Sequence, residues 1–177
     1  MDVKRELAAQ FRAGLAMLSD CVEKCPDDLW TSPSPRIDEG DRIIYRSFWR
    51  IAYHAVYFTH LYLGQGEDAF APWPGRRPAW YEEMWHKPWA LEPFEFPEAA
   101  EPPARNEVLE YIAYLDAQVG PILDSLDLES SDSGFPWYPN HSKLAHELLN
   151  LRHLQGHVGQ LSEILLAKEI ETRWISR

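Results

Sequence analysis

The residues in this chain best suited to chemistry are its seven histidines, two of which stand four positions apart in the run His153-Leu154-Gln155-Gly156-His157. Side chains four apart on a helix point the same way, with their Cβ atoms roughly 5–6 Å apart. Two imidazoles at that spacing can both reach one metal ion at about 2.0–2.1 Å. Solvated helices carry such pairs by chance, so this spacing alone does not establish a metal site.

The surroundings of the pair add weight to a metal site. Asn150 and Gln160 share its side of the helix, which is therefore not simply a charged outer face. Gly156 and Gly159 each cost a helix interior about 1 kcal/mol relative to alanine. Their presence predicts that a neighbouring helix or a ligand approaches closely at this point.

His54 is the third candidate ligand. It shares a helical face with Ile51, Phe58 and Leu61. A histidine on an apolar face is usually a core residue with one hydrogen bond, and it becomes a metal ligand only where partners converge on it. The residues around His54 leave both interpretations open.

Two further histidines have weaker cases. His60 lies six residues after His54, about 240° around a helix of 3.6 residues per turn, and is predicted to face the surface or a partner. His146 lies seven residues before His153, on the same face. We predict that it faces solvent near the helix start; the alternative places it beside the metal or at the mouth of a cleft.

Apolar residues at steps of three and four predict the elements that must position these side chains. Helices are expected over residues 3–25, 45–63, 104–126 and 142–169, with loops over 31–40 and 129–140, where turn-forming residues gather. No strand is predicted. The sequence therefore indicates an all-α fold, a four-helix bundle, in a single domain over residues 1–177.

The second and third helices are joined by a long crossover over residues 66–104, which holds eight prolines and half of the chain's eight tryptophans. Disordered linkers rarely carry so many large aromatic residues. We predict an ordered crossover with a short helix near Ala79–His86, long enough for the helices on either side to run parallel. The crossover tryptophans Trp80, Trp85 and Trp89 are expected to pack, or alternatively to bind an apolar substrate. Three tyrosines outside the crossover are also expected to pack, or alternatively to donate a hydrogen bond to the substrate; they are Tyr57, Tyr111 and Tyr114.

Charge and composition exclude several classes of partner. The formal net charge of −11 argues against nucleic acid and anionic membrane as partners. No apolar run approaches the roughly 18 residues of a membrane span, and the N-terminus lacks the apolar core of a secretory signal. We therefore expect a cytoplasmic protein with reduced cysteines, because a disulfide between Cys21 and Cys25, four apart on a helix, would be strained.

With these residues in view, the sequence resembles the DinB-like or YfiT-like family of metalloenzymes (DinB superfamily). The resemblance rests on the run Phe48-Trp49-Arg50-Ile51-Ala52-Tyr53-His54 and on the run from Leu149 to Gln160, which carries the family's His-x3-His pair followed by a glutamine. It extends over most of the chain through the order and lengths of the helices. Many members have a basic residue directly after the last histidine, where this chain has Val158.

The resemblance implies an up-down-down-up bundle with a divalent metal, zinc or nickel, held by His54, His153 and His157. Some relatives transfer low-molecular-weight thiols to electrophiles, and others are isomerases or hydrolases. The expected function is a metal-dependent thiol transferase or hydrolase that acts on a small molecule. The alternative is a non-catalytic metal-binding or dimerising module, in which exposed aromatics such as Trp174 and Tyr138 contact a second copy.

Overall fold

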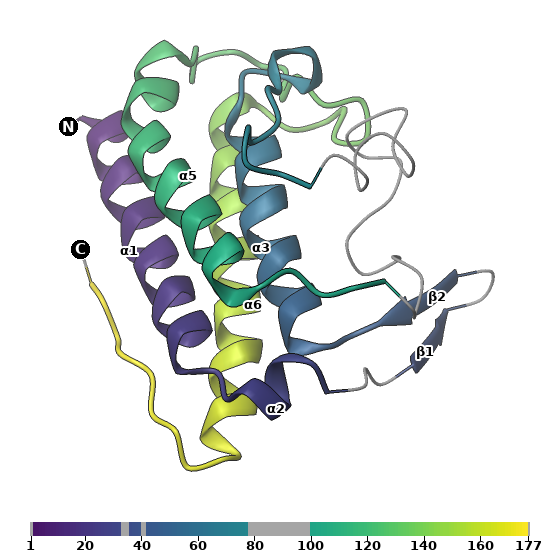
Figure 1. Cartoon of the computed structure of the whole chain (residues 1–177). Coiled ribbons are helices and arrows are strands. Elements are labelled where there is room, and N and C mark those ends of the chain that lie inside the picture. Colours follow the sequence, from purple (N-terminus) through teal and green to yellow (C-terminus); the bar gives the residue numbers. More distant parts are fainter. Residues whose placement is uncertain (1, 33–35, 40–41, 78–99, 177) are drawn as a thin grey trace.

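The computed structural model describes residues 2–32, 36–39, 42–77 and 100–176 (Figure 1). Its four long helices are α1 (Val3–Lys24), α3 (Phe48–Leu63), α5 (Arg105–Ser125) and α6 (Lys143–Leu166). A short helix, α2 (Asp27–Trp30), follows α1, and a 3-10 turn, η1 (Glu67–Ala69), follows α3. Each long helix ends within three residues of the range predicted from apolar spacing, which confirms the helical class of the protein's body.

The four long helices lie side by side (Figure 1). α1 and α3 both pack against α5 and α6, so that the pair α3·α6 forms one side of the body and the pair α1·α5 another. In the view of Figure 1 the chain passes down α1, up α3, up α5 and down α6, and α3 and α5 therefore run parallel. The contact between α3 and α6 brings His54 to the histidine pair.

The core is built from the apolar stripes of these helices. Each fully buried leucine or phenylalanine contributes about 1.5–3 kcal/mol to the hydrophobic stabilisation of the fold. All residues of α3 are buried, as expected for a helix that is apolar on every side. In α6 the apolar residues at steps of three and four are buried from Leu154 onward, whereas Leu148, earlier in the same series, is 55% exposed. The buried stripe residues of α1, α5 and α6 include Leu7, Phe11, Leu15, Leu18, Val22, Val108, Ile112, Leu115, Val119, Leu154, Val158, Leu161 and Leu165.

A β-hairpin precedes α3, where the sequence predicted a loop and no strand. Strand β1 (Arg36–Glu39) pairs antiparallel with β2 (Arg42–Tyr45), and Ile37 lies opposite Ile44. The prediction is wrong here because a run of β-branched and aromatic residues after Gly40-Asp41 is typical of a hairpin. Tyr45, predicted as the first residue of the helix, is the last residue of β2, and α3 begins three residues later than predicted, after Ser47.

Only part of the crossover lies within the described residues. Trp73 is buried there and stacks on Tyr111 of α5, with ring centroids 4.8 Å apart and planes 5° apart. The short helix predicted near Ala79–His86, with Trp80, Trp85 and Trp89, lies outside the described residues.

Three smaller features complete the description. Cys21 and Cys25 are both free thiols, as predicted, and both are buried. The last helix ends at Leu166 rather than near Glu169, where the backbone turns into the left-handed region (φ 61°). Among the described helices, none combines the length and the apolar character needed to cross a bilayer.

Candidate metal centre

The packing of α3 against α6 brings the three predicted histidines into one cluster. His54 lies on the second turn of α3, on the side that faces α6. His153 and His157 lie on consecutive turns of α6, opposite His54. His153 Nε2 lies 3.0 Å from His54 Nε2 and 3.0 Å from His157 Nε2. Two nitrogens each about 2.1 Å from one ion, and about 90–110° apart around it, are about 3.0–3.4 Å apart. The three side chains could therefore hold one metal ion.

A hydrogen bond sets the tautomer of His157. Its Nδ1–H donates to Gln160 Oε1, one turn further along α6, at 2.8 Å. A neutral imidazole carries one proton, so His157 Nε2 presents its lone pair to the cluster. This is the form in which imidazole binds a metal, with the other ring nitrogen held by an acceptor.

Ordinary two-centre hydrogen bonds between neutral rings do not account for both short contacts in the cluster. Because His157 Nε2 is an acceptor, its 3.0 Å contact requires a proton on His153 Nε2. The 3.0 Å contact with His54 Nε2 would then be a hydrogen bond only if this one N–H were shared between two acceptors. A single cation shared by the three lone pairs accounts for both contacts. The residues present therefore fit a bound metal.

The surroundings keep the three imidazoles neutral. Burial lowers the pKa of His54 well below its ordinary value, and the two neighbouring imidazoles and Arg46 lower it further. Burial and His157 lower the pKa of His153 to about 3. Burial and Arg46 also lower the pKa of His157, although the bond to Gln160 opposes the shift. Neutral rings are the state that ligates a metal at neutral pH.

One side of the cluster is aromatic and the other reaches the surface. The Phe58 ring lies 4.5 Å from His54 and 6.0 Å from His153, and Tyr62 lies 6.2 Å from His153. His54 and His157 are 5% and 9% exposed, whereas His153 is half-buried. His153 is thus the most accessible of the three ligand candidates.

Two histidines were placed wrongly from the sequence. His60, predicted at the surface or facing a partner, is 6% exposed and hydrogen-bonds through Nδ1 to the Tyr111 hydroxyl at 2.9 Å. His146, predicted to face solvent, is fully buried and stacks on Phe135 at 4.6 Å. The two errors have different causes. His60 is buried because α3 is covered on all sides, and His146 is buried because the aromatic loop before α6 packs on the start of that helix.

The glycines of α6 also differ from the prediction. A Cβ atom placed on Gly156 or on Gly159 meets nothing within 4 Å, so no helix or other described segment approaches them. The close approach occurs elsewhere, at Gly14 of α1, where a Cβ would lie 2.8 Å from Leu154 Cδ2. An exposed glycine costs the helix stability without allowing any contact, and the structure offers no packing reason for the pair.

Other side chains near the site were missed or only partly foreseen. Arg46, between the hairpin and α3, acts electrostatically on His54 and His157. It lay inside the range predicted for the helix, but it precedes α3 in the structure, so helical periodicity does not give its position. Asn150 is fully buried and donates through Nδ2 to the Thr59 carbonyl at 3.1 Å, which ties α6 to α3 one turn before His153.

The chain was compared with family models, with curated proteins and with solved structures, and none of them matches.

Proposed function

We propose that this protein is a metal-dependent enzyme of the DinB-like type, an up-down-down-up four-helix bundle in which His54, His153 and His157 hold a divalent ion, zinc or nickel. The observation that supports this proposal is the cluster of three Nε2 atoms. Its two 3.0 Å contacts suit one shared cation, and two-centre hydrogen bonds between neutral rings do not account for both. We further propose that the protein acts in the cytoplasm on a small molecule.

Among the described residues the donor set has three members, which favours a catalytic rather than a structural ion. Structural zinc is usually enclosed by four protein ligands, whereas catalytic zinc has three and an open position. Three neutral imidazoles leave the ion its full charge, and such an ion lowers the pKa of a bound water or thiol to near neutrality. The proposed reaction is therefore the transfer of a low-molecular-weight thiol to a small electrophile, or the hydrolysis of that electrophile by a bound water.

The chain's own residues have distinct roles in this proposal. Gln160 holds His157 in the ligating tautomer, and Phe58 with Tyr62 excludes water from one side of the cluster. Arg46 supplies positive charge near the site, where the family resemblance would place a basic residue at Val158. Although its positive charge comes from Arg46, before α3, and not from the position of Val158 on α6, the site remains suited to a substrate with an anionic group.

Elemental analysis of the full chain, purified without a histidine tag, tests metal binding. We expect about one zinc or nickel ion per chain, and less than about a tenth of that in His54→Ala, because loss of one of three ligands removes a large share of the affinity. The matched control is His141→Ala, a half-buried histidine outside the cluster, which should keep its metal. If wild-type protein purified from a metal-supplemented culture contained no metal, the proposal would be contradicted.

Catalysis needs its own test. The metal-loaded protein is assayed for thiol transfer and for ester or amide hydrolysis with panels of small electrophiles. Activity should disappear on chelation, return with metal, and fall at least about a hundredfold in His153→Ala. Full activity in that variant would refute the proposed site.

A second candidate is a metal-binding or dimerising module without activity, favoured by the exposure of Trp174 (80%) and Leu166 (53%). X-ray absorption distinguishes the two, since a module is expected to show four protein ligands and an enzyme three with an exchangeable one. Sedimentation of Trp174→Ala tests whether that tryptophan contacts a second copy.

A further inference from the structure

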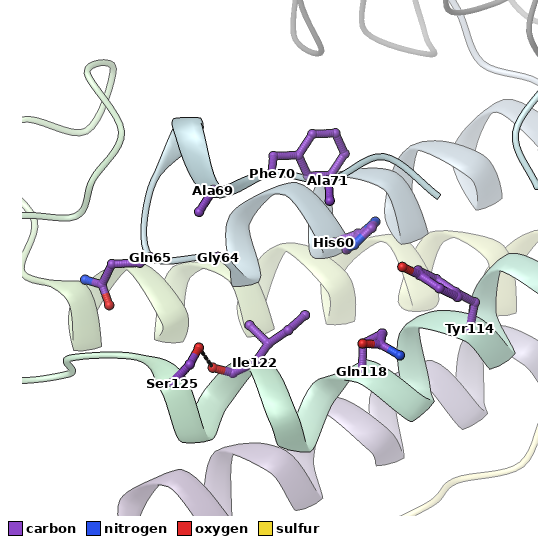
Figure 2. A pocket seen from close by; sticks show the side chains of 10 residues that line it. All are labelled: His60, Gly64, Gln65, Ala69, Phe70, Ala71, Tyr114, Gln118, Ile122 and Ser125. Carbon is purple, nitrogen blue, oxygen red and sulfur yellow. Dashed lines mark hydrogen bonds between the residues drawn. The ribbon is translucent and has the colours of Figure 1, made fainter. Parts of the chain in front are cut away.

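A separate pocket of about 250 Å³ lies between α3, the segment after η1, and α5 (Figure 2). His60 lines it from α3, Phe70 from the segment after η1, and Tyr114, Gln118 and Ile122 from α5. His60 lies six residues after the proposed metal ligand His54, which places the two side chains about 120° apart around α3. The pocket is therefore distinct from the metal centre.

His60 is held rigidly at the pocket. It is 6% exposed, and its Nδ1 lies 2.9 Å from the Tyr111 hydroxyl. Tyr111 is itself 1% exposed and stacks on Trp73 with centroids 4.8 Å apart. Within the described part of the chain, His60 Nε2 has no hydrogen-bond partner, so this nitrogen is available to a molecule in the pocket.

Two more polar groups converge on the same space. Figure 2 shows the Tyr114 hydroxyl directed towards His60, with the Gln118 amide on the next turn of α5. Neither group hydrogen-bonds to another described residue. The Phe70 ring lies edge-on to His60 at 5.0 Å, and Tyr114 lies edge-on at 5.8 Å. Polar atoms free to bond, set among aromatic rings, are the usual lining of a small-molecule site.

The pocket carries no charge of its own. Among the described residues that line it there is no aspartate, glutamate, lysine or arginine. Burial lowers the pKa of His60 to about 4, so the imidazole is neutral at pH 7. A charged ligand would lose its hydration here and find no counter-charge. The volume of about 250 Å³ corresponds to about eight waters at about 30 Å³ each.

We propose that this pocket is a second binding site, for a small uncharged aromatic molecule that carries both a hydrogen-bond donor and an acceptor, such as an aromatic amide. The aromatic ring packs against Phe70 and Tyr114, and the polar group bonds to His60 Nε2 and the Gln118 amide. This site does not depend on the metal centre and can be tested in the absence of activity.

Benzamide serves as the probe, in a titration of the full chain followed by the ring C–H resonances of His60 in NMR spectra. Saturable shifts of His60 with a Kd of about 1 mM or below are expected for a probe of about nine non-hydrogen atoms. Benzoate has the same shape and a negative charge, and it should bind at least about tenfold more weakly. The resonances of His54, His153 and His157 should stay unchanged.

Three variants locate the site. Gln118→Leu removes the amide at similar volume and should weaken benzamide at least about fivefold. Ala71→Phe fills the pocket from an exposed position without touching the core, and should abolish binding. Gln10→Leu, on an exposed part of α1, is the matched control and should bind as the wild type does. Absence of saturable shifts at His60, equal affinity for benzoate, or unchanged binding in Ala71→Phe would overturn the proposal.

Discussion

Replacing Lys143 by methionine should destabilise the fold by about 3–5 kcal/mol, because it would leave a buried carboxylate without its cation. Lys143 and Glu147 lie one turn apart at the start of α6, with 0% of either side chain exposed and 3.1 Å between Nζ and Oε1. The ammonium also donates to the Gly64 carbonyl and, at 3.2 Å, to the Ser133 carbonyl. It thus joins α6 to the end of α3 and to the loop before α6.

The magnitude follows from what the substitution leaves behind. Methionine nearly conserves volume, so the cavity cost is small. The Glu147 carboxylate stays in the interior, and removal of one partner of a buried pair typically costs about 3–5 kcal/mol. Replacing both partners removes the buried charge altogether. Lys143→Met/Glu147→Leu should therefore recover more than half of the loss, a coupling energy of about 2 kcal/mol or more.

Urea denaturation followed by far-ultraviolet circular dichroism measures the effect. With an m-value of about 2 kcal/mol per molar, a loss of about 4 kcal/mol lowers the midpoint by about 2 M. Lys168→Met, at an exposed lysine just after α6, is the matched control and should change stability by less than about 0.5 kcal/mol. A single variant within about 1 kcal/mol of wild type, or a double variant no more stable than the single, would refute the reasoning.

Three further predictions follow from burial, space and charge. Gly156→Ala should stabilise the fold by about 0.5–1 kcal/mol in the same urea assay, because the new Cβ has no atom within 4 Å. Gly14→Ala should give no gain in stability, because its Cβ would lie 2.8 Å from Leu154 Cδ2. Burial raises the pKa of the Cys25 thiol to about 12, so a disulfide reagent at pH 8 should label Cys25 at least about a hundredfold faster in guanidinium than in the native protein; equal rates would contradict its burial. Burial raises the pKa of Asp20, but hydrogen bonds from Arg173 and Lys24 outweigh it and the net shift is downward. The stability that Asp20 contributes should therefore be complete above its unfolded pKa of about 3.9 and lost as pH falls through the lower folded value; a deficit of Asp20→Asn that persists unchanged at pH 2 would count against this pairing.

The helices were predictable because the residues that determine them are near neighbours in the sequence. Apolar residues at steps of three and four, with Ser142 before α6 and Pro26 after α1, mark the ends of a helix within a few residues. The hairpin at 36–45 was missed for the opposite reason. Its strands are four residues each, too short for periodicity to distinguish them from a loop and a helix start.

The candidate site was only partly accessible to sequence reasoning. The spacing of His153 and His157 was visible as one turn of a helix, and His54 was singled out on its apolar face with the help of a family resemblance. The spacing of Gln160 placed it on the same side of the helix as His157, but its hydrogen bond to His157 Nδ1, which sets the tautomer, was not predicted. The charge of Arg46 acts between elements, and spacing along one helix cannot show whether a residue before a different helix lies near the cluster.

The sequence by itself determined which stretches become helices, which of their faces are apolar, and that two imidazoles share one side of α6, since all three follow from the 3.6-residue period. The tertiary structure decided what each face meets. It covered α3 on every side, so that His60 became a pocket residue, buried His146 under the loop before α6, and left Gly156 and Gly159 exposed. The reason is physical: periodicity is set by neighbours in the chain, whereas burial is set by the crossing of helices that are about a hundred residues apart in sequence.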